Sequence, residues 1–102
     1  SGSLNTIEGV MLLRDIGTAH ALRGELASAL EIFAEARTTL TGLGALGTPH
    51  GAKLLSSIGM SKRAMGDLRG ALEVYREAER IHCRSGTLET PDGAGLLTGI
   101  GI

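Results

Sequence analysis

The residues best suited to chemistry in this chain are three histidines and one cysteine, because imidazole and thiolate are the ligands that zinc prefers. No two of them stand at i and i+4, the spacing that places two ligands on one helix face. His82 and Cys83 are neighbours, so their side chains project in diverging directions. The sequence therefore predicts neither a metal site nor a metal cofactor. The candidate ligands considered are His20, His50, His82 and Cys83.

Nucleophilic catalysis needs a nucleophile, a base and an orienting group that converge in one pocket. The residue types for such a group are present as Ser56, Ser57, His50 and Asp92. Their spacing does not bring them together, so we expect no enzyme activity.

The glycines of residues 42–47 (GLGALG) have the spacing of a dinucleotide-binding loop. That interpretation requires a preceding strand, a following helix that cradles phosphate, and an acidic residue about 20 positions further on. Here the run follows a predicted helix. We interpret it as a helix stop and a loop, and predict no nucleotide cofactor.

Composition limits the classes of protein that this chain can belong to. Its 102 residues suffice for one compact unit, and a net charge of -1 gives no general attraction to nucleic acid or to an anionic membrane. The apolar runs are far shorter than the roughly 20 residues that span a bilayer. A lone cysteine suits a reducing compartment. We expect a cytoplasmic protein, with residues 1–3 as a cloning remnant.

The elements that position these residues follow from a period of 42 residues. Thr48–Leu55 (TPHGAKLL) returns as Thr90–Leu97 (TPDGAGLL), residues 24–26 (GEL) return as residues 66–68 (GDL), and residues 29–31 (ALE) return as residues 71–73. A period in this range indicates stacked supersecondary units that share one core.

Each unit is predicted to contain two helices. The first covers about residues 5–22 and again 49–65, where Thr48 can accept at the N-cap and Pro49 suits the first helical position. Its second copy carries a stripe of Leu54, Leu55, Ile58, Lys62 and Met65.

The second helix follows Gly24 or Gly66, and Gly44 has the place of a left-handed residue that closes it. Its buried face is predicted to be Leu68, Ala71, Leu72, Tyr75, Ala78 and Ile81, and its solvated face Arg69, Glu73, Arg76, Glu77 and Arg80. The solvated face includes a Glu77–Arg80 pair at i,i+3. No segment alternates with a period of two, so the chain is predicted to be all-α.

The residues at corresponding positions of the two units (the columns of the repeat) resemble the signature of the tetratricopeptide repeat family. That signature has a large residue, Leu and Gly in the first helix, then Gly, Tyr and Ala. The second copy matches it with Leu55, Ile58, Gly59, Gly66, Leu68, Ala71, Tyr75 and Ala78, and the first with Leu13, Ile16, Gly17, Gly24, Leu26, Ala29, Phe33 and Ala36. The unit is longer than the usual length of about 34 residues, and is similar to the long variant of kinesin light chains. The family's aromatic late in the first helix is replaced by His20 and Lys62, and its helix-ending proline by Thr41 and Cys83.

The resemblance implies an α-solenoid of antiparallel helix hairpins. Residues 4–47 would form the first repeat, 48–89 the second, and 90–102 the first helix of a truncated third repeat, which is a fifth helix without a hairpin partner. Phe33 and Tyr75 would fill the gap to the following repeat. Gly17 and Gly59 would let the two helices of a repeat lie close together.

The resemblance also implies a protein–protein interaction scaffold that binds peptide segments in a concave groove lined by the first helices. Carried over by position, the groove candidates are Met11, Arg14, Thr18, Lys53, Ser56, Met60, Arg63 and Thr98. This mixture suits a peptide with an acidic and an apolar side chain. The set that clamps a terminal carboxylate in some members is missing.

The alternative is a structural module that assembles with its own copies. The uncharged residues 93–102 would leave an apolar face exposed once their helix covers the second hairpin. That face would associate with another copy in a homo-oligomer, or else the chain is a fragment of a longer array. The self-association candidates are Leu96, Leu97, Ile100 and Ile102.

Overall fold

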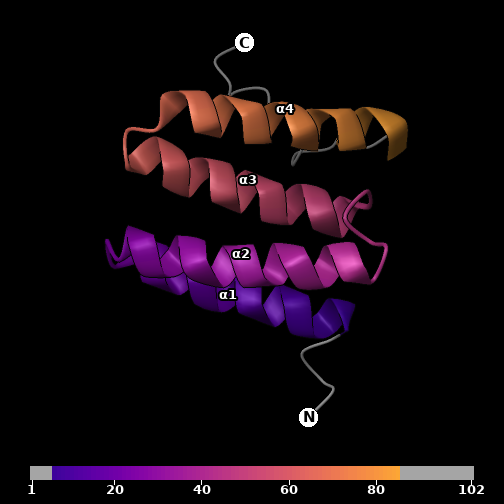
Figure 1. Ribbon diagram of the computed structural model, residues 1–102, viewed down its shortest axis with the longest axis horizontal. Helices are drawn as coiled ribbons and strands as arrows, with labels where there is room; N and C mark the ends of the chain where they lie inside the picture. The colour runs from indigo at the N-terminus through magenta and orange to yellow at the C-terminus, as the bar shows by residue number, and fades with distance from the viewer. Residues whose placement is uncertain (1–5, 86–102) are drawn as a thin grey trace.

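Four helices follow one another along residues 6–85, the part of the chain that the computed structural model describes (Figure 1). α1 spans Ile7–Leu22, α2 Leu26–Gly42, α3 Pro49–Ala64 and α4 Leu68–Ser85. Short connections reverse the chain between them, and residues 6–85 contain no strand. The prediction of an all-α protein is confirmed, and the predicted helix ends lie within two residues of those observed.

Glycines with a left-handed backbone end three of the helices. Gly24 (φ 83°) and Gly66 (φ 90°) lie between the helices of each pair, and Gly44 (φ 71°) follows α2. A side chain destabilises this conformation and glycine does not, so these positions fix the turns. The prediction for Gly44 is confirmed.

A short polar side chain caps the start of α1, whereas the starts of α2 and α3 have no side-chain cap. The Thr6 hydroxyl accepts a hydrogen bond from the Gly9 amide at 3.0 Å, which caps α1. Thr48 has the extended backbone of an N-cap residue, as predicted, but its side chain caps nothing. The Thr48 hydroxyl instead donates to the Ala45 carbonyl at 2.5 Å, because the α2–α3 connection turns back on itself there. The predicted capping role of the Thr48 side chain is therefore wrong.

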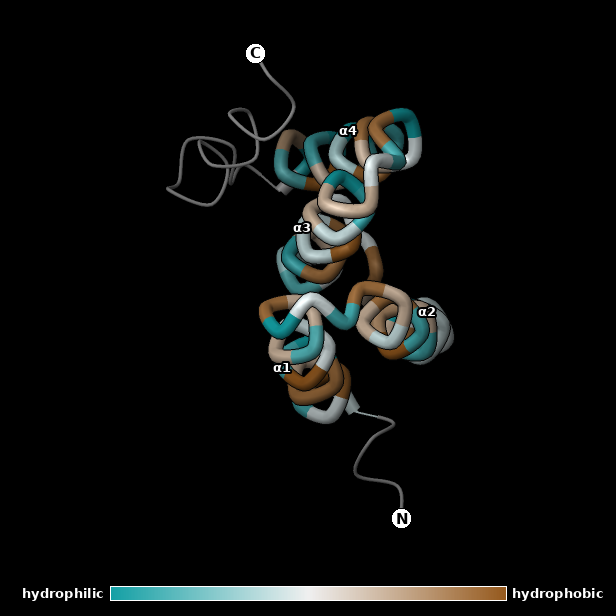
Figure 2. The backbone as a smooth tube through the Cα atoms, turned by 90° about the vertical axis from the view of Figure 1, so that its left-hand side faces the viewer, coloured by the Kyte–Doolittle hydropathy of each residue, from teal (hydrophilic) through white to brown (hydrophobic). Residues whose placement is uncertain are grey.

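The helices pack as two pairs, α1 with α2 and α3 with α4, and α3 also contacts both helices of the first pair. Figure 2 shows α1 and α3 on one side of the molecule and α2 on the other. The first helices of the two sequence units thus share a side.

The core lies between these helices and contains few large side chains. Among the described residues, the largest fully buried side chains are Phe33, Leu40, Leu54, Leu55 and Val10.

Two glycines make room for the aromatic rings. A Cβ atom at Gly17 would lie 2.6 Å from the Phe33 ring, and one at Gly59 would lie 2.9 Å from the Tyr75 ring. Each ring therefore packs directly against the backbone of the first helix in its own pair.

Two predictions about the core are wrong, and one buried residue was missed. Met65 and Leu68 were predicted to lie on buried stripes, but they are 53% and 65% exposed, because they flank the turn at Gly66 and no neighbouring helix covers them. Val74 was not predicted to be buried, yet only 8% of it is exposed.

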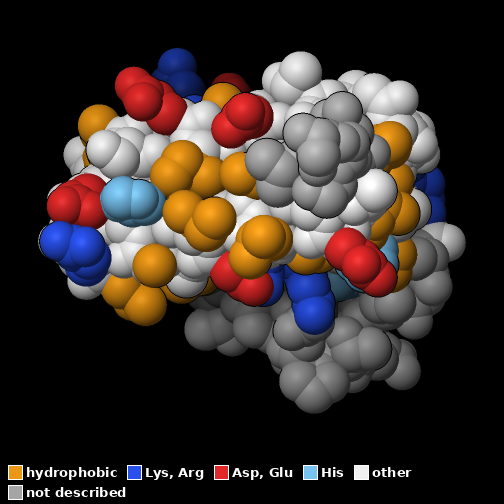
Figure 3. All heavy atoms as spheres, turned by 90° about the horizontal axis from the view of Figure 1, so that it is seen from below, with side chains coloured by type: hydrophobic (Ala, Val, Ile, Leu, Met, Phe, Trp, Pro, Cys, Tyr) orange, Lys and Arg blue, Asp and Glu red, His pale blue; other side chains and the backbone are white. Residues whose placement is uncertain are grey.

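The far side of α1 exposes apolar side chains as well. Leu12 is 53% exposed and Ile16 41% exposed, one helical turn apart. Figure 3 looks at this end of the molecule and shows hydrophobic side chains gathered across it.

Glu77 was predicted to lie on a solvated face beside Arg80. Instead, both of its carboxylate oxygens accept hydrogen bonds from Nη2 of Arg37, at 3.1 and 2.9 Å. Both side chains are only about a third exposed, so the contact ties α2 to α4 across the two pairs. The sequence pattern of α4 cannot show this contact, because its partner lies 40 residues away.

We expect the Arg37–Glu77 pair to contribute about 0.5–1 kcal/mol to stability, since it is about a third exposed and has two hydrogen bonds. A double-mutant cycle of Arg37→Gln and Glu77→Gln, followed by urea denaturation, measures this coupling. It should fall as salt concentration rises. Additive effects of the two substitutions would show that the pair contributes nothing.

Candidate functional site

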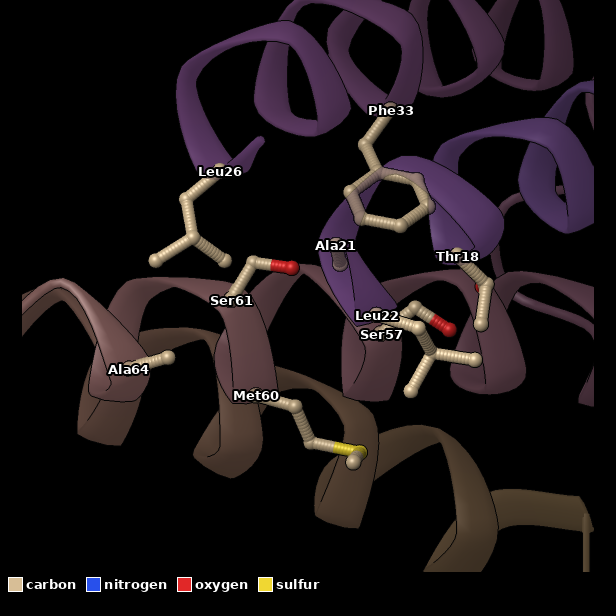
Figure 4. Close-up of a pocket in the computed structure, with 9 residues that line it drawn as sticks. All are labelled: Thr18, Ala21, Leu22, Leu26, Phe33, Ser57, Met60, Ser61 and Ala64. Atoms are coloured by element: carbon tan, nitrogen blue, oxygen red, sulfur yellow. The ribbon is translucent and has the colours of Figure 1, made fainter. Parts of the chain in front are cut away.

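A pocket opens where the C-terminal half of α1 and the start of α2 face α3 (Figure 4). Its volume is about 180 Å³. An apolar cavity of about 150 Å³ holds a benzene-sized molecule, so this pocket has room for one leucine, methionine or phenylalanine side chain. The lining residues are Thr18, Ala21, Leu22, Leu26, Phe33, Ser57, Met60, Ser61 and Ala64.

Two of the three hydroxyl groups around the pocket, those of Thr18 and Ser57, are engaged within their own helices. The Thr18 hydroxyl donates to the Arg14 carbonyl at 2.8 Å, and the Ser57 hydroxyl donates to the Lys53 carbonyl at 3.2 Å. Both bonds run back along the same helix, so the methyl and methylene groups remain to line the space. Most of the other lining side chains are apolar, so the pocket favours an apolar group.

Of the predicted groove residues, the structure brings Thr18 and Met60 to this pocket. Met60 is 57% exposed, so it forms part of the open rim. Met11 instead packs partly buried against the core. Ser56 is half-buried and does not line the pocket, while Thr98 lies outside the described residues, as do Leu96, Leu97, Ile100 and Ile102.

The predicted basic residues differ in their surroundings. The Arg14 side chain is 28% exposed, and its Nη2 donates to Asp15 at 3.2 Å, which partly offsets its charge. Lys53 and Arg63 are exposed on α3. Arg63 directly precedes Ala64 of the pocket wall in sequence.

Sequence reasoning missed most of the pocket wall. Phe33 was assigned to the gap between repeats, and its ring does line that space. Ser57, Ser61 and Ala64 stand at i, i+4 and i+7 of α3, a spacing of small residues that could have indicated a hollow beside this helix. Leu22 is 85% exposed beside it, and nothing in its sequence position pointed to a site.

A second hollow, between α2, α3 and α4, is a weaker candidate. Ile58, Leu30 and Val74 line it together with Ala34, Arg37 and Lys62. Its two cations have partners already, because Arg37 binds Glu77 and Nζ of Lys62 lies 3.8 Å from Asp67. A ligand would have to displace both.

Tyr75 is the one described residue of this region with an altered acidity. Burial raises the pKa of its hydroxyl above the ordinary value, and the positive charge of Arg63 opposes part of that rise. The hydroxyl is buried and has no hydrogen-bond partner among residues 6–85. The neutral form is therefore the one that the fold accommodates.

We expect Tyr75→Phe to leave stability at neutral pH unchanged or raised by up to about 1 kcal/mol, since a buried hydroxyl without a partner is removed. Above about pH 10 the unfolded chain loses the tyrosine proton while the folded chain keeps it. The unfolded state then binds fewer protons, and the parent protein loses stability as pH rises. Urea denaturation at pH 7 and pH 10.5 should show a smaller alkaline loss for the phenylalanine variant. An equal loss in both proteins would contradict this account.

The candidate metal ligands form no cluster among residues 6–85, and Asp92 lies outside the described residues. His82 is buried on α4, while its neighbour Cys83 is exposed. His20 is half-exposed and its Nδ1 lies 2.7 Å from Glu25. Residues 6–85 contain no group of three potential metal ligands, and none of their helices is both long and apolar enough to cross a membrane.

Comparison with known proteins gives no further assignment of this site. No family model, no curated protein and no solved structure shows significant similarity to the chain.

Proposed function

We propose that this chain is a segment of an α-solenoid of tetratricopeptide type, with each helix pair as one antiparallel hairpin, and that it acts as a protein-interaction scaffold. Three observations support the proposal. The sequence repeats every 42 residues, each described repeat forms one packed helix pair, and α1 and α3 lie on one side of the molecule. In such an array that side holds the peptide.

The observation that carries the proposal is the apolar pocket between α1, α2 and α3. It lies between the two helix pairs and has room for one side chain. A peptide that lies along α1 and α3 would insert an apolar residue there, and the flexible Met60 side chain on the rim adapts to its shape. Burying such a residue contributes about 1.5–3 kcal/mol.

The partner is a peptide segment with an apolar anchor and an acidic residue close to it. Arg63 is exposed and directly precedes Ala64 of the pocket wall, while Lys53 stands earlier on α3 and Arg14 on α1. Replacing all three by alanine should weaken capture of such a peptide while leaving the helix content intact.

A matched pair of methionines tests the pocket itself. Met60 is 57% exposed and lines the pocket, whereas Met65 is 53% exposed and does not. With a peptide selected from a displayed random library, Met60→Glu should weaken binding at least tenfold, or about 1.4 kcal/mol. Fluorescence anisotropy measures this loss, and Met65→Glu should bind within about twofold of the parent protein. Equal effects of the two substitutions would show that the peptide binds elsewhere.

The structural, self-assembling alternative stays a prediction, since its residues lie outside the described part of the chain. It is distinguished by light scattering over a wide range of concentration. A mass that rises with concentration while peptide capture is absent would favour assembly over the scaffold.

A further inference from the structure

The exposed face of α1 carries the same residue types that α3 buries. Leu12 and Ile16 stand one period before Leu54 and Ile58. Leu54 is fully buried and Ile58 is 6% exposed, against 53% and 41% for their counterparts. α3 packs against α2 of the preceding pair, and no described helix stands before α1. The face of α1 therefore has the composition of a covered face.

An acidic residue at the neighbouring helix fits the same interpretation. Glu35 of α2 stands one period before Glu77 of α4. Glu77 binds Arg37, which comes from the second helix of the preceding pair. Glu35 is exposed, and neither a hydrogen bond nor an ion pair joins it to another described residue. If the Arg37–Glu77 contact recurs one period earlier, the partner of Glu35 is an arginine on the second helix of a pair placed before α1.

We infer that Leu12, Ile16 and Glu35 form a docking surface for one further helix pair of the same 42-residue type, supplied from outside these 102 residues. The second helix of that pair must carry, at the corresponding positions, the side chains with which α2 faces α3 and α4. Ile58 shares its surroundings with Leu30, Ala34 and Arg37 of α2. The partner therefore carries a leucine, a small residue and an arginine at the corresponding positions.

The α4 helix of a second copy of the chain does not carry the residues that this docking surface requires. Arg76 and Glu79 stand there in the positions of Ala34 and Arg37. A bulky charged residue would meet the apolar face of α1, and Glu79 would meet Glu35 with the same sign of charge, which disfavours that pairing. The docking surface also lies apart from the peptide pocket, since neither Leu12 nor Ile16 lines it.

The test extends the full chain with a helix pair of the required chemistry. A copy of residues 6–47 is joined directly before Thr6, in place of residues 1–5, which keeps the 42-residue period. We expect one cooperative thermal transition, with Tm raised by at least about 5 °C over the parent chain. Leu12→Ser with Ile16→Ser in the original α1 should abolish the rise. Glu35→Ala in the original α2 and Arg37→Ala in the added copy should each reduce the rise in Tm. The two substitutions together should reduce it no further than either alone.

Other outcomes overturn the inference. A separate unfolding transition of the added pair would show that it does not dock. A rise in Tm that survives the two serine substitutions would place the contact elsewhere. For the unextended chain, a third outcome is a dimer in light scattering that the serine substitutions dissolve and Glu35→Ala leaves intact. That dimer would mean that a second copy covers the face without the ion pair.

Discussion

Gly51→Ala should destabilise the protein by about 3 kcal/mol, a large effect for the addition of one methyl group. Gly51 is buried near the start of α3, and a Cβ atom there would overlap the backbone carbonyl of Leu46. Backbone cannot rotate away as the end of a side chain can, so the α2–α3 connection itself would have to move. The same column of the repeat holds Gly9 and Gly93, as expected if the close approach recurs in each unit.

Gly42→Ala is the matched control for this substitution. Gly42 is the last residue of α2, and nothing lies within 4 Å of a Cβ atom built there. Alanine restricts the unfolded chain more than glycine does and favours the helix, so this variant should be unchanged or more stable by up to about 1 kcal/mol. Urea denaturation followed by circular dichroism measures both. Similar losses in the two variants would contradict the packing described at Gly51.

Leu54→Ala should cost about 3 kcal/mol, whereas Leu12→Ala should cost less than about 1 kcal/mol. The two leucines occupy the same column of the repeat. Leu54 is fully buried and Leu12 is half-exposed, so only the first substitution leaves a cavity. The same denaturation experiment measures both losses. Equal losses would mean that the face of α1 is already covered in the isolated chain.

The 42-residue period predicted the four helices and their ends well, because glycines and helix-start residues are local signals. It could not distinguish the exposed Leu12 from the buried Leu54. The two leucines have the same position in the repeat, and their exposure depends on whether another helix pair packs against them. The contact of Arg37 with Glu77 was missed for a similar reason. It joins side chains from different units, and the pattern of one helix describes only its own faces.

The candidate site was predicted only in part. Carrying the family's groove over by position named Thr18 and Met60, and both line the pocket. The same procedure named Met11, which packs against the core instead. The remaining wall comes from three helices and includes Leu22, Leu26 and Phe33. Their convergence depends on how α1, α2 and α3 cross, and a periodic pattern does not specify that crossing.

The central claim is that a peptide places an apolar side chain in the pocket between α1, α2 and α3. The chain has three methionines, Met11, Met60 and Met65, and only Met60 lines this pocket. Nuclear magnetic resonance of ¹³C-methyl-labelled methionine therefore gives the most direct test. On titration with a selected peptide, the Met60 methyl signal should shift strongly, while the Met11 and Met65 signals stay near their original positions. A peptide that binds and leaves the Met60 signal unmoved would contradict the claim.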